Sequence, residues 1–218
     1  MDVFEAVQNR HSVRSYLDTP IPEETAKKLR GAIEDVNRES GLHFALFTQE
    51  LTGFAGKLKN VRNYIAFAGS GEKLEERIGY YGAKLMLEAQ MLGLNSCWVA
   101  MSFNKGAVTK LMALQEGEKV VNALALGYGE TQGIPHRTKP MKKLCRRDGP
   151  MPDWFRKGME TVMLAPTAIN QQQFLFTLAD GTVSARAKLG PCSQVDLGIV
   201  KYYFEIGSGK KVFSQDKK

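Results

Sequence analysis

A short segment near the N-terminus carries the side chains best suited to binding an anion. Residues 10–16 read Arg-His-Ser-Val-Arg-Ser-Tyr and follow a stretch with the pattern of a short helix. Arginine offers a permanently charged, forked donor, serine a hydroxyl and histidine a ring N–H, which together suit a phosphate. In an extended segment, Arg10, Ser12 and Arg14 share one face because strand side chains alternate. The sequence thus predicts an anion clamp, with a solvated basic loop as the alternative.

A second basic segment lies just beyond an apolar, strand-like run over residues 120–129. It reads PHRTKP over residues 135–140, and the basic run KKLCRR follows shortly after. Segments beyond strand ends often contact ligands. Arg137 and Lys139 are therefore candidates to hold the same phosphate as Arg10, and a solvated charged loop is again the alternative. The later run adds general positive potential.

Two further stretches could contact a ring system. Residues 165–174, APTAINQQQF, form a polar run whose Thr, Asn and Gln side chains both donate and accept hydrogen bonds. Such side chains suit a heteroaromatic ring with carbonyl and N–H groups, whereas Pro166 and Asn170 also fit plain turn and capping chemistry. Residues 98–103, WVAMSF, would supply backbone N–H groups beside an apolar wall. On its own this second stretch is typical of core.

Other common site types lack their motifs. The three histidines are scattered without metal-ligand spacing, and the sequence has no GxSxG, P-loop or Rossmann fingerprint. We therefore expect no metal site and no side-chain nucleophile. If the chain is an enzyme, a bound organic cofactor is expected to carry the chemistry.

The overall composition describes a basic globular chain. It has 218 residues, a formal net charge of +7 and a pI of about 9.3. That charge attracts phosphates, nucleotides, nucleic acid or acidic membrane surfaces without choosing among them. We expect no membrane span, because no run approaches the ~18 apolar residues needed, and no signal peptide, because the first ten residues lack an apolar core. The three cysteines, without CxxC spacing, favour a reducing compartment, so a cytoplasmic location is expected.

The elements that must position these residues alternate between helices and strands. Helices are predicted over residues 2–9, 23–36, 75–92, 104–114 and 153–164, with a last one over 197–206 capped by Asp196. Strands are predicted over residues 43–48, 64–69, 120–129, 174–179 and 182–187, the last two as a hairpin, with a short strand near Val212. Residues 96–103 are predicted as a strand that leads into a loop. This order predicts the α+β class.

The two halves of the chain share a weak internal repeat. Residues 23–48 read helix, connector and strand, as do residues 153–178, and a mostly apolar helix follows each unit, at 79–94 and 196–209. Duplication would make two related halves around a pseudo-twofold axis. Chance similarity of two helix–strand units is the alternative.

Taken together, these stretches resemble the FMN-dependent nitroreductase family. Its N-terminal signature, Arg-(Arg/His)-Ser-x-(Arg/Lys)-x-(Phe/Tyr), matches residues 10–16. The pattern Gly-Leu-x-x-Cys-Trp at 93–98 and the Leu-Gly-Tyr strand end at 126–128 are also similar to that family. The family's Ala-Pro-Ser-x-x-Asn-x-Gln-Pro-Trp motif normally lies near the N-terminus. Its counterpart here is at residues 165–174, in the C-terminal half, and Gln173 and Phe174 replace the Pro-Trp end.

The displaced motif resembles a subgroup in which one chain contains two copies of the half-fold. The resemblance then implies a nitroreductase-like α+β fold with an antiparallel or mixed sheet flanked by helices. It implies a single-chain pseudo-dimer: an N-terminal half, residues 1–150, with the phosphate-binding residues, and a C-terminal half, residues 151–218, with the APTAIN motif. Ordinary members build each FMN site from two subunits, and fusion would supply both sides within one chain.

The resemblance also implies which residues bind FMN. Arg10, His11 and Ser12 would hold the phosphate and ribityl chain, Arg14 the N1/O2 edge of the ring, and Arg137 and Lys139 the rest of the phosphate. The backbone of Val99, Ala100 and Met101 would line the ring near N5 and O4. The other half would contribute Pro166, Thr167, Ala168 and Asn170. No residue is predicted to be catalytic in its own right.

The function implied is an FMN-dependent NAD(P)H oxidoreductase. NADH or NADPH would deliver a hydride, leave, and be replaced by a nitroaromatic or quinone-like acceptor, so ping-pong kinetics are expected. The alternatives are a non-catalytic flavin carrier and a nucleic-acid-binding protein, although the aromatic residues do not interleave with the basic ones as stacking platforms would. The expected partners are small molecules, and the chain is expected to be a monomer or a homodimer.

Overall fold

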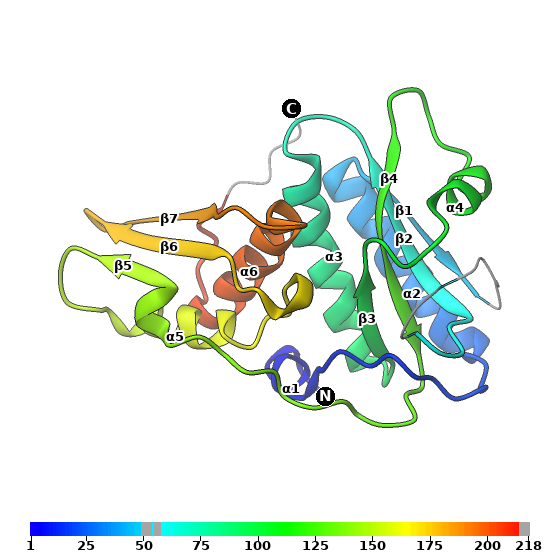
Figure 1. Ribbon diagram of the computed structural model, residues 1–218, viewed down its shortest axis with the longest axis horizontal. Coiled ribbons are helices and arrows are strands. Elements are labelled where there is room, and N and C mark those ends of the chain that lie inside the picture. Colours follow the sequence, from blue (N-terminus) through cyan, green and yellow to red (C-terminus); the bar gives the residue numbers. More distant parts are fainter. Residues whose placement is uncertain (49–53, 55–57, 214–218) are drawn as a thin grey trace.

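The computed structural model describes residues 1–48, 54 and 58–213. These residues form two β-sheets, one at each side of the molecule, with helices packed between them (Figure 1). The class is α+β, as predicted. Among the described residues, no helix combines the length and apolar character needed to cross a bilayer.

The larger sheet is built from four antiparallel strands in the order β1-β2-β4-β3. Their bounds are β1 His43–Phe47, β2 Asn63–Gly69, β3 Asn95–Val99 and β4 Lys119–Gly127. Every residue of β2 is buried, which explains its continuous apolar sequence. Helix α2 (Glu23–Ser40) packs on β1, α3 (Leu74–Met91) on β2, β3 and β4, and the short α4 (Lys105–Leu111) on β4.

The smaller sheet has three strands in the order β5-β6-β7. Strands β6 (Phe174–Ala179) and β7 (Thr182–Ala187) form the predicted hairpin, and β5 (Cys145–Arg147) pairs parallel to β6. Helix α6 (Ser193–Ser208) packs on β6 and β7 and against α5 (Asp153–Val162). Phe174 and Phe176 point from β6 into the shared core.

Helices α3 and α6 join the two sheets by packing against each other in the middle of the molecule (Figure 1). They approach so closely that glycine is required on both. A Cβ atom at Gly79 would collide with the carbonyl of Val195, and one at Gly198 would collide with the backbone of Glu76 and Tyr80. This crossing fixes the position of the C-terminal half relative to the N-terminal half.

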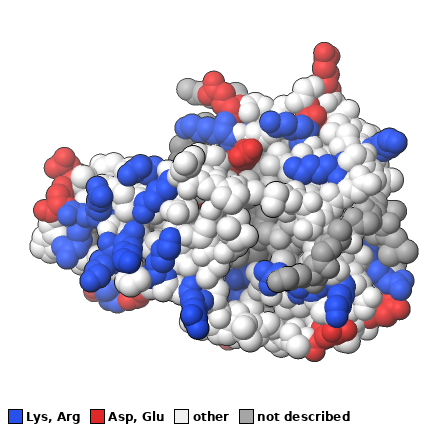
Figure 2. Space-filling view, in the orientation of Figure 1, with Lys and Arg blue, Asp and Glu red and all other residues white. Residues whose placement is uncertain are grey.

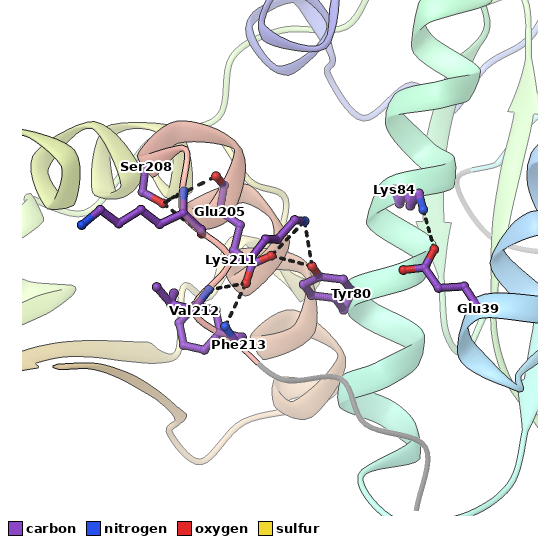
Figure 3. Close-up of polar contacts among 9 residues, drawn as sticks. Glu39, Tyr80, Lys84, Glu205, Ser208, Lys211, Val212 and Phe213 are labelled. Atoms are coloured by element: carbon purple, nitrogen blue, oxygen red, sulfur yellow. Dashed lines mark hydrogen bonds and ion pairs between the residues drawn. The ribbon is translucent and has the colours of Figure 1, made fainter.

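The segment after α6 is tied back to the same helix pair through Glu205, which is buried (Figure 3). Its carboxylate accepts hydrogen bonds from the Tyr80 hydroxyl on α3 and from the backbone N–H groups of Val212 and Phe213, and it pairs with Lys211 at 3.1 Å. A buried carboxylate is stable only when such donors surround it. Glu205 therefore anchors residues 211–213 across the α3–α6 pair.

Most predicted elements are present, and four details of the prediction are wrong. The helix expected to reach residue 114 ends at Leu111. The basic segment expected as a loop contains a 3₁₀ turn, Met141–Lys143, and β5. Residues 211–213 form no strand. Asp196 does not cap a helix starting at 197, because α6 already begins at Ser193.

Candidate active site

The Arg10 segment is held rigidly between a helix end and the larger sheet. Helix α1 (Val3–Asn9) starts with a capping box between Asp2 and Glu5. At its C-cap, Arg10, the backbone becomes extended. The Val13 N–H then donates to the Ser96 carbonyl at 3.0 Å, and the Tyr16 hydroxyl donates to the Val13 carbonyl at 2.8 Å.

Val13 and Tyr16 lie in the core. Ser12 and Arg14 instead face a cleft, as the alternation of an extended segment predicts.

The turn between α5 and β6, called the late turn below, has a strained backbone. It runs through a 3₁₀ turn, Ala168–Asn170, between α5 and β6. Ile169, Asn170 and Gln172 have φ values of 46°, 55° and 47°. Asparagine tolerates this left-handed region, but a β-branched isoleucine is strained there. Strain of this kind persists only where the surroundings enforce it.

Residues 137–139 clasp the turn on one side. Gln172, which is buried, donates from Nε2 to the Arg137 carbonyl at 2.9 Å and to Asn170 Oδ1 at 2.8 Å, and its Oε1 accepts from the Lys139 N–H at 2.7 Å. Asn170 Nδ2 donates to the same Arg137 carbonyl at 2.8 Å. The Lys139 ammonium donates to the Gln171 carbonyl at 2.6 Å. The two sequence segments predicted to bind one ligand are therefore hydrogen-bonded to each other.

Asp196 clasps the turn on the other side. Its carboxylate accepts from the Ala168 N–H at 2.9 Å and from Gln171 Nε2 at 2.8 Å, and the residue is only 2% exposed. Burial raises the pKa of Asp196 to about 6, although both hydrogen bonds lower the pKa. Asp196 is thus a positioning group within the first turn of α6.

Two clefts that share several lining residues lie between the Arg10 segment and the late turn. The outer cleft has about 1120 Å³ of empty space, including its open mouth, and the inner pocket about 520 Å³. The predicted site residues that line the outer cleft are Arg10, His11, Ser12, Arg14, Arg137, Pro166, Thr167 and Asn170. Ala100 and Ala168 line the inner pocket.

The outer cleft is electropositive. It is lined by three guanidinium-bearing side chains and by no carboxylate of a described residue. Burial lowers the pKa of His11 and of His136, and the nearby Arg10 charge lowers both pKa values further. Arg10 is 2% exposed, and its Nε has no hydrogen-bond partner among the described residues. This arrangement fits an anionic group such as a phosphate.

More positive charge lies beside the cleft. Lys and Arg side chains gather on the lobe that carries β5, β6 and β7 (Figure 2). Partial burial lowers the pKa of Lys188 there, and the nearby charges of Lys139, Arg186 and Arg146 lower that pKa further. The lobe therefore adds to the potential that attracts anions to the cleft.

The inner pocket is more apolar than the outer cleft, although Arg14, Thr167 and Asp196 also line it. Trp98, Val195 and Ile199 line it together with Cys97, and burial raises the pKa of the Cys97 thiol, which stays protonated at neutral pH. Asn122 on β4 also lines this pocket. A flat apolar ring with polar edges matches such a lining.

Three predicted residues do not line either cleft. Val99 is buried at the end of β3, and Met101, just beyond, is 85% exposed. The Lys139 ammonium binds the backbone of the late turn instead of facing the cleft. Sequence reasoning missed Asn122 and the positioning roles of Gln172 and Asp196. A polar residue within the apolar run 120–127 is the signal that could have pointed to Asn122.

Comparison with known proteins identifies what this architecture is similar to. A family model described as "Putative TM nitroreductase" matches residues 2–208. A solved structure from Thermotoga maritima, described as a "putative nitroreductase", is 21% identical, covers 95% of this chain and 83% of its own, and has a TM-score of 0.68. A search of curated proteins gives no match.

Other solved structures cover less of the chain. One from Parabacteroides distasonis, described as a "Putative NADH dehydrogenase/NAD(P)H nitroreductase", is 23% identical with a TM-score of 0.53 and covers 65% of this chain and 95% of its own. A nitroreductase family protein from Streptococcus pneumoniae is 14% identical with a TM-score of 0.52 and covers 65% and 98%. At these identities the likeness concerns the fold.

Proposed function

The chain belongs to the family described as "Putative TM nitroreductase", and from this membership we propose that it is an FMN-dependent NAD(P)H oxidoreductase. Nitroreductases are oxidoreductases, so the class of reaction follows from the family. The cofactor, the electron donor and the acceptor are the proposed part. The single observation that carries them is the pair of adjoining clefts, which join an electropositive end to a more apolar end.

The residues of the clefts fit FMN end to end. In the outer cleft, the Arg10 guanidinium has a buried Nε without a partner among the described residues, which suits a phosphate oxygen. His11, Ser12 and Arg137 complete this anion site. In the inner pocket, Trp98 and Ile199 provide an apolar lining for the isoalloxazine ring. Thr167 and Asn170, which line the same cleft, would contact the cofactor from the C-terminal part of the chain.

The protein's part in the reaction is to bind and polarise the cofactor. FMN, when bound, supplies two-electron redox chemistry between a nicotinamide and an acceptor. Arg14 lines both clefts, so its charge would stabilise negative charge near the N1/O2 edge of the ring. We propose no side-chain acid or base, because hydride transfer through the cofactor requires none. Cys97 stays a neutral thiol, since burial raises its pKa.

The donor and the acceptor use the same open space in this proposal. Alternate occupation of one pocket gives ping-pong kinetics with NADH or NADPH and a nitroaromatic or quinone-like acceptor. The names of similar proteins, one of them an NAD(P)H nitroreductase, support this pairing. The proposed setting is the cytoplasm, in line with three free cysteines.

The experiment is anaerobic reduction of the purified, FMN-loaded protein. NADH or NADPH should bleach the flavin absorbance, and a nitroaromatic or quinone added afterwards should restore it. A protein that binds FMN but is not bleached by either nucleotide would be a flavin carrier instead. A protein that takes up no FMN and binds nucleic acid in a steeply salt-dependent way would support the third alternative.

A further inference from the structure

We propose that Asn122 is a positioning residue that recognises the flavin ring by accepting a hydrogen bond from its N3–H. This inference rests on the proposed function and deepens it. It concerns a residue that the sequence motifs do not contain.

Six buried side-chain atoms among the described residues lack a hydrogen-bond partner. They are Arg10 Nε, Arg77 Nε, Gln90 Oε1, Ser96 Oγ, Asn122 Oδ1 and the Tyr203 hydroxyl. Only two of these residues line the clefts: Arg10 the outer one and Asn122 the inner one. A buried polar group without a partner costs about 1–3 kcal/mol, so each such group in a native protein needs an explanation.

The two partnerless atoms are chemically complementary to the two ends of FMN. Arg10 Nε is a donor and requires an acceptor, which a phosphate oxygen provides. Asn122 Oδ1 is an acceptor and requires a donor. Oxidised isoalloxazine carries a single N–H, at N3, between the carbonyl groups at C2 and C4. Arg10 Nε, the hydrogen-bond donor, therefore belongs to the cleft proposed for the phosphate. Asn122 Oδ1, the hydrogen-bond acceptor, belongs to the pocket proposed for the ring.

The position of Asn122 in the sheet supports this match. By strand alternation, Asn122 lies on the same face of β4 as Leu124 and Leu126, the face that packs toward α3. Ala123 and Ala125 instead face the second core cluster. Asn122 is 4% exposed. It lies one residue beyond the last β3–β4 pair, Val99 with Ala123, so β3 has already ended beside it and the inner pocket opens there.

Neighbouring groups are consistent with the pyrimidine edge of the ring. Arg14 lines the same pocket and is a donor for a ring carbonyl. Ala100, just past the end of β3, also lines it. Arg14 as a donor and Asn122 as an acceptor suit a ring carbonyl and the N–H group beside it. A ribityl hydroxyl or a nicotinamide carboxamide could also donate to Asn122, and the experiment separates these from N3–H.

The experiment compares binding of FMN and of N3-methyl-FMN, which has no N3–H. Dissociation constants are measured by flavin fluorescence for the wild type, Asn122→Leu and the control Gln90→Leu. Gln90 is a buried amide with a partnerless oxygen outside both clefts. Loss of one neutral hydrogen bond corresponds to about a tenfold change in affinity.

The proposal predicts three results. The wild type prefers FMN over N3-methyl-FMN by about tenfold or more. Asn122→Leu binds FMN about tenfold more weakly and no longer discriminates between the two flavins, whereas Gln90→Leu keeps the full preference. The thermal midpoint of the flavin-free Asn122→Leu protein equals or exceeds that of the wild type, because a buried amide oxygen without a hydrogen-bond partner has been removed. A purely structural role for Asn122 would lower that midpoint and leave the preference intact.

Failure of this inference can be told from failure of the proposed function. If the wild type binds both flavins equally well, or if Asn122→Leu retains the preference, Asn122 does not accept N3–H, although FMN binding stands. If the wild type binds neither flavin, the proposed function itself is wrong. The comparison of the two flavins on the wild type needs no variant, so it decides the matter even if Asn122→Leu does not fold.

Discussion

Ile169 is held in a backbone conformation that its own side chain opposes. Its φ of 46° lies in the left-handed region, and the side chain is 84% exposed at the edge of both clefts. Burial of the Ile169 side chain therefore does not compensate for the strain in its backbone. Such strain, of the order of 1–3 kcal/mol, is typical of binding sites, where geometry is maintained at the expense of stability.

Replacing Ile169 with glycine should therefore stabilise the flavin-free protein. Glycine adopts the left-handed region freely, but it also makes the unfolded chain more flexible, so we expect a net gain of about 1 kcal/mol. Urea unfolding measures this. Ile169→Val is the matched control, because valine keeps the β-branch and the strain. A glycine variant no more stable than the valine variant would mean that the turn is not strained at this residue.

The buried carboxylate of Asp196 should make stability depend on pH. Its folded pKa of about 6 exceeds the reference value of 3.8. Between these values the folded state keeps a proton that the unfolded state has released. The free energy of unfolding should therefore fall as pH rises from about 4 to about 6, by up to about 3 kcal/mol.

Asp196→Asn stays neutral and isolates this effect from all other titrations. We expect the free energy of unfolding of the wild type to fall relative to that of the variant as pH rises from 4.5 to 7.5, and the gap to stay constant above that. Urea titrations of both flavin-free proteins at several pH values measure the gap. A gap that does not vary with pH would show that Asp196 has an ordinary pKa.

Individual site residues were predictable from sequence only where local pattern defined them. Arg10, Ser12 and Arg14 follow from alternation in one extended segment. Asn122 and Asp196 do not, because their significance depends on what other segments bring, or fail to bring, within hydrogen-bond distance. Asp196 in particular resembled an N-cap in sequence, yet its carboxylate accepts from Ala168 and Gln171, which are 25 or more residues away.

At the scale of elements, strong periodicity was a reliable guide. The prediction for the helix with the strongest local signal, 75–92, differs from α3 by one residue at each end, and the hairpin around the Asp-Gly turn is in place. The short β5 was missed, since three residues with two arginines have no strand pattern and β5 exists only because it pairs with β6. Pairing partners distant in sequence leave little local signal.

The crossing of α3 and α6 gives a prediction at this scale. Gly198→Ala places a methyl group against the backbone of Glu76 and Tyr80, which cannot yield without moving one helix. We expect a loss of roughly 1–3 kcal/mol or more in the free energy of unfolding, as for other overpacked sites. Weaker FMN binding should accompany it, because α6 carries Asp196 and hence the late turn.

The matched control is Gly31→Ala on α2, where an added Cβ meets no atom within 4 Å. There, alanine should stabilise the helix by about 1 kcal/mol through higher helix propensity. Thermal unfolding of the two variants should therefore shift in opposite directions. Equal shifts would mean that α3 and α6 can separate without cost.

At the scale of the whole molecule, the two sides of the cleft come from distant parts of one chain. We propose that the chain is a fused pseudo-dimer, and the reciprocal glycine contacts of α3 and α6 support this. The division at residue 150 stays a prediction, and β5 pairs across it with β6.

The order of helices and strands along the chain could be predicted from sequence, because the α+β alternation and the family motifs are local patterns. The way the halves meet was not, because it depends on backbone-to-backbone contact at Gly79 and Gly198, which no hydrophobic pattern encodes. The displaced APTAIN motif pointed to the late turn as a binding element. The hydrogen bonds that join this turn to Arg137, Lys139 and Asp196 could be seen only in the structure.

The most direct measurement for the central claim is a stoichiometric titration of the purified chain with FMN, followed by flavin fluorescence at chain concentrations well above the dissociation constant. Because one chain supplies both the Arg10 segment and the late turn, the titration should end at one FMN per chain. Binding should weaken greatly in Arg10→Met and also in Asn170→Ala, one variant from each side. An end point of zero, or binding that survives both substitutions, would contradict the account.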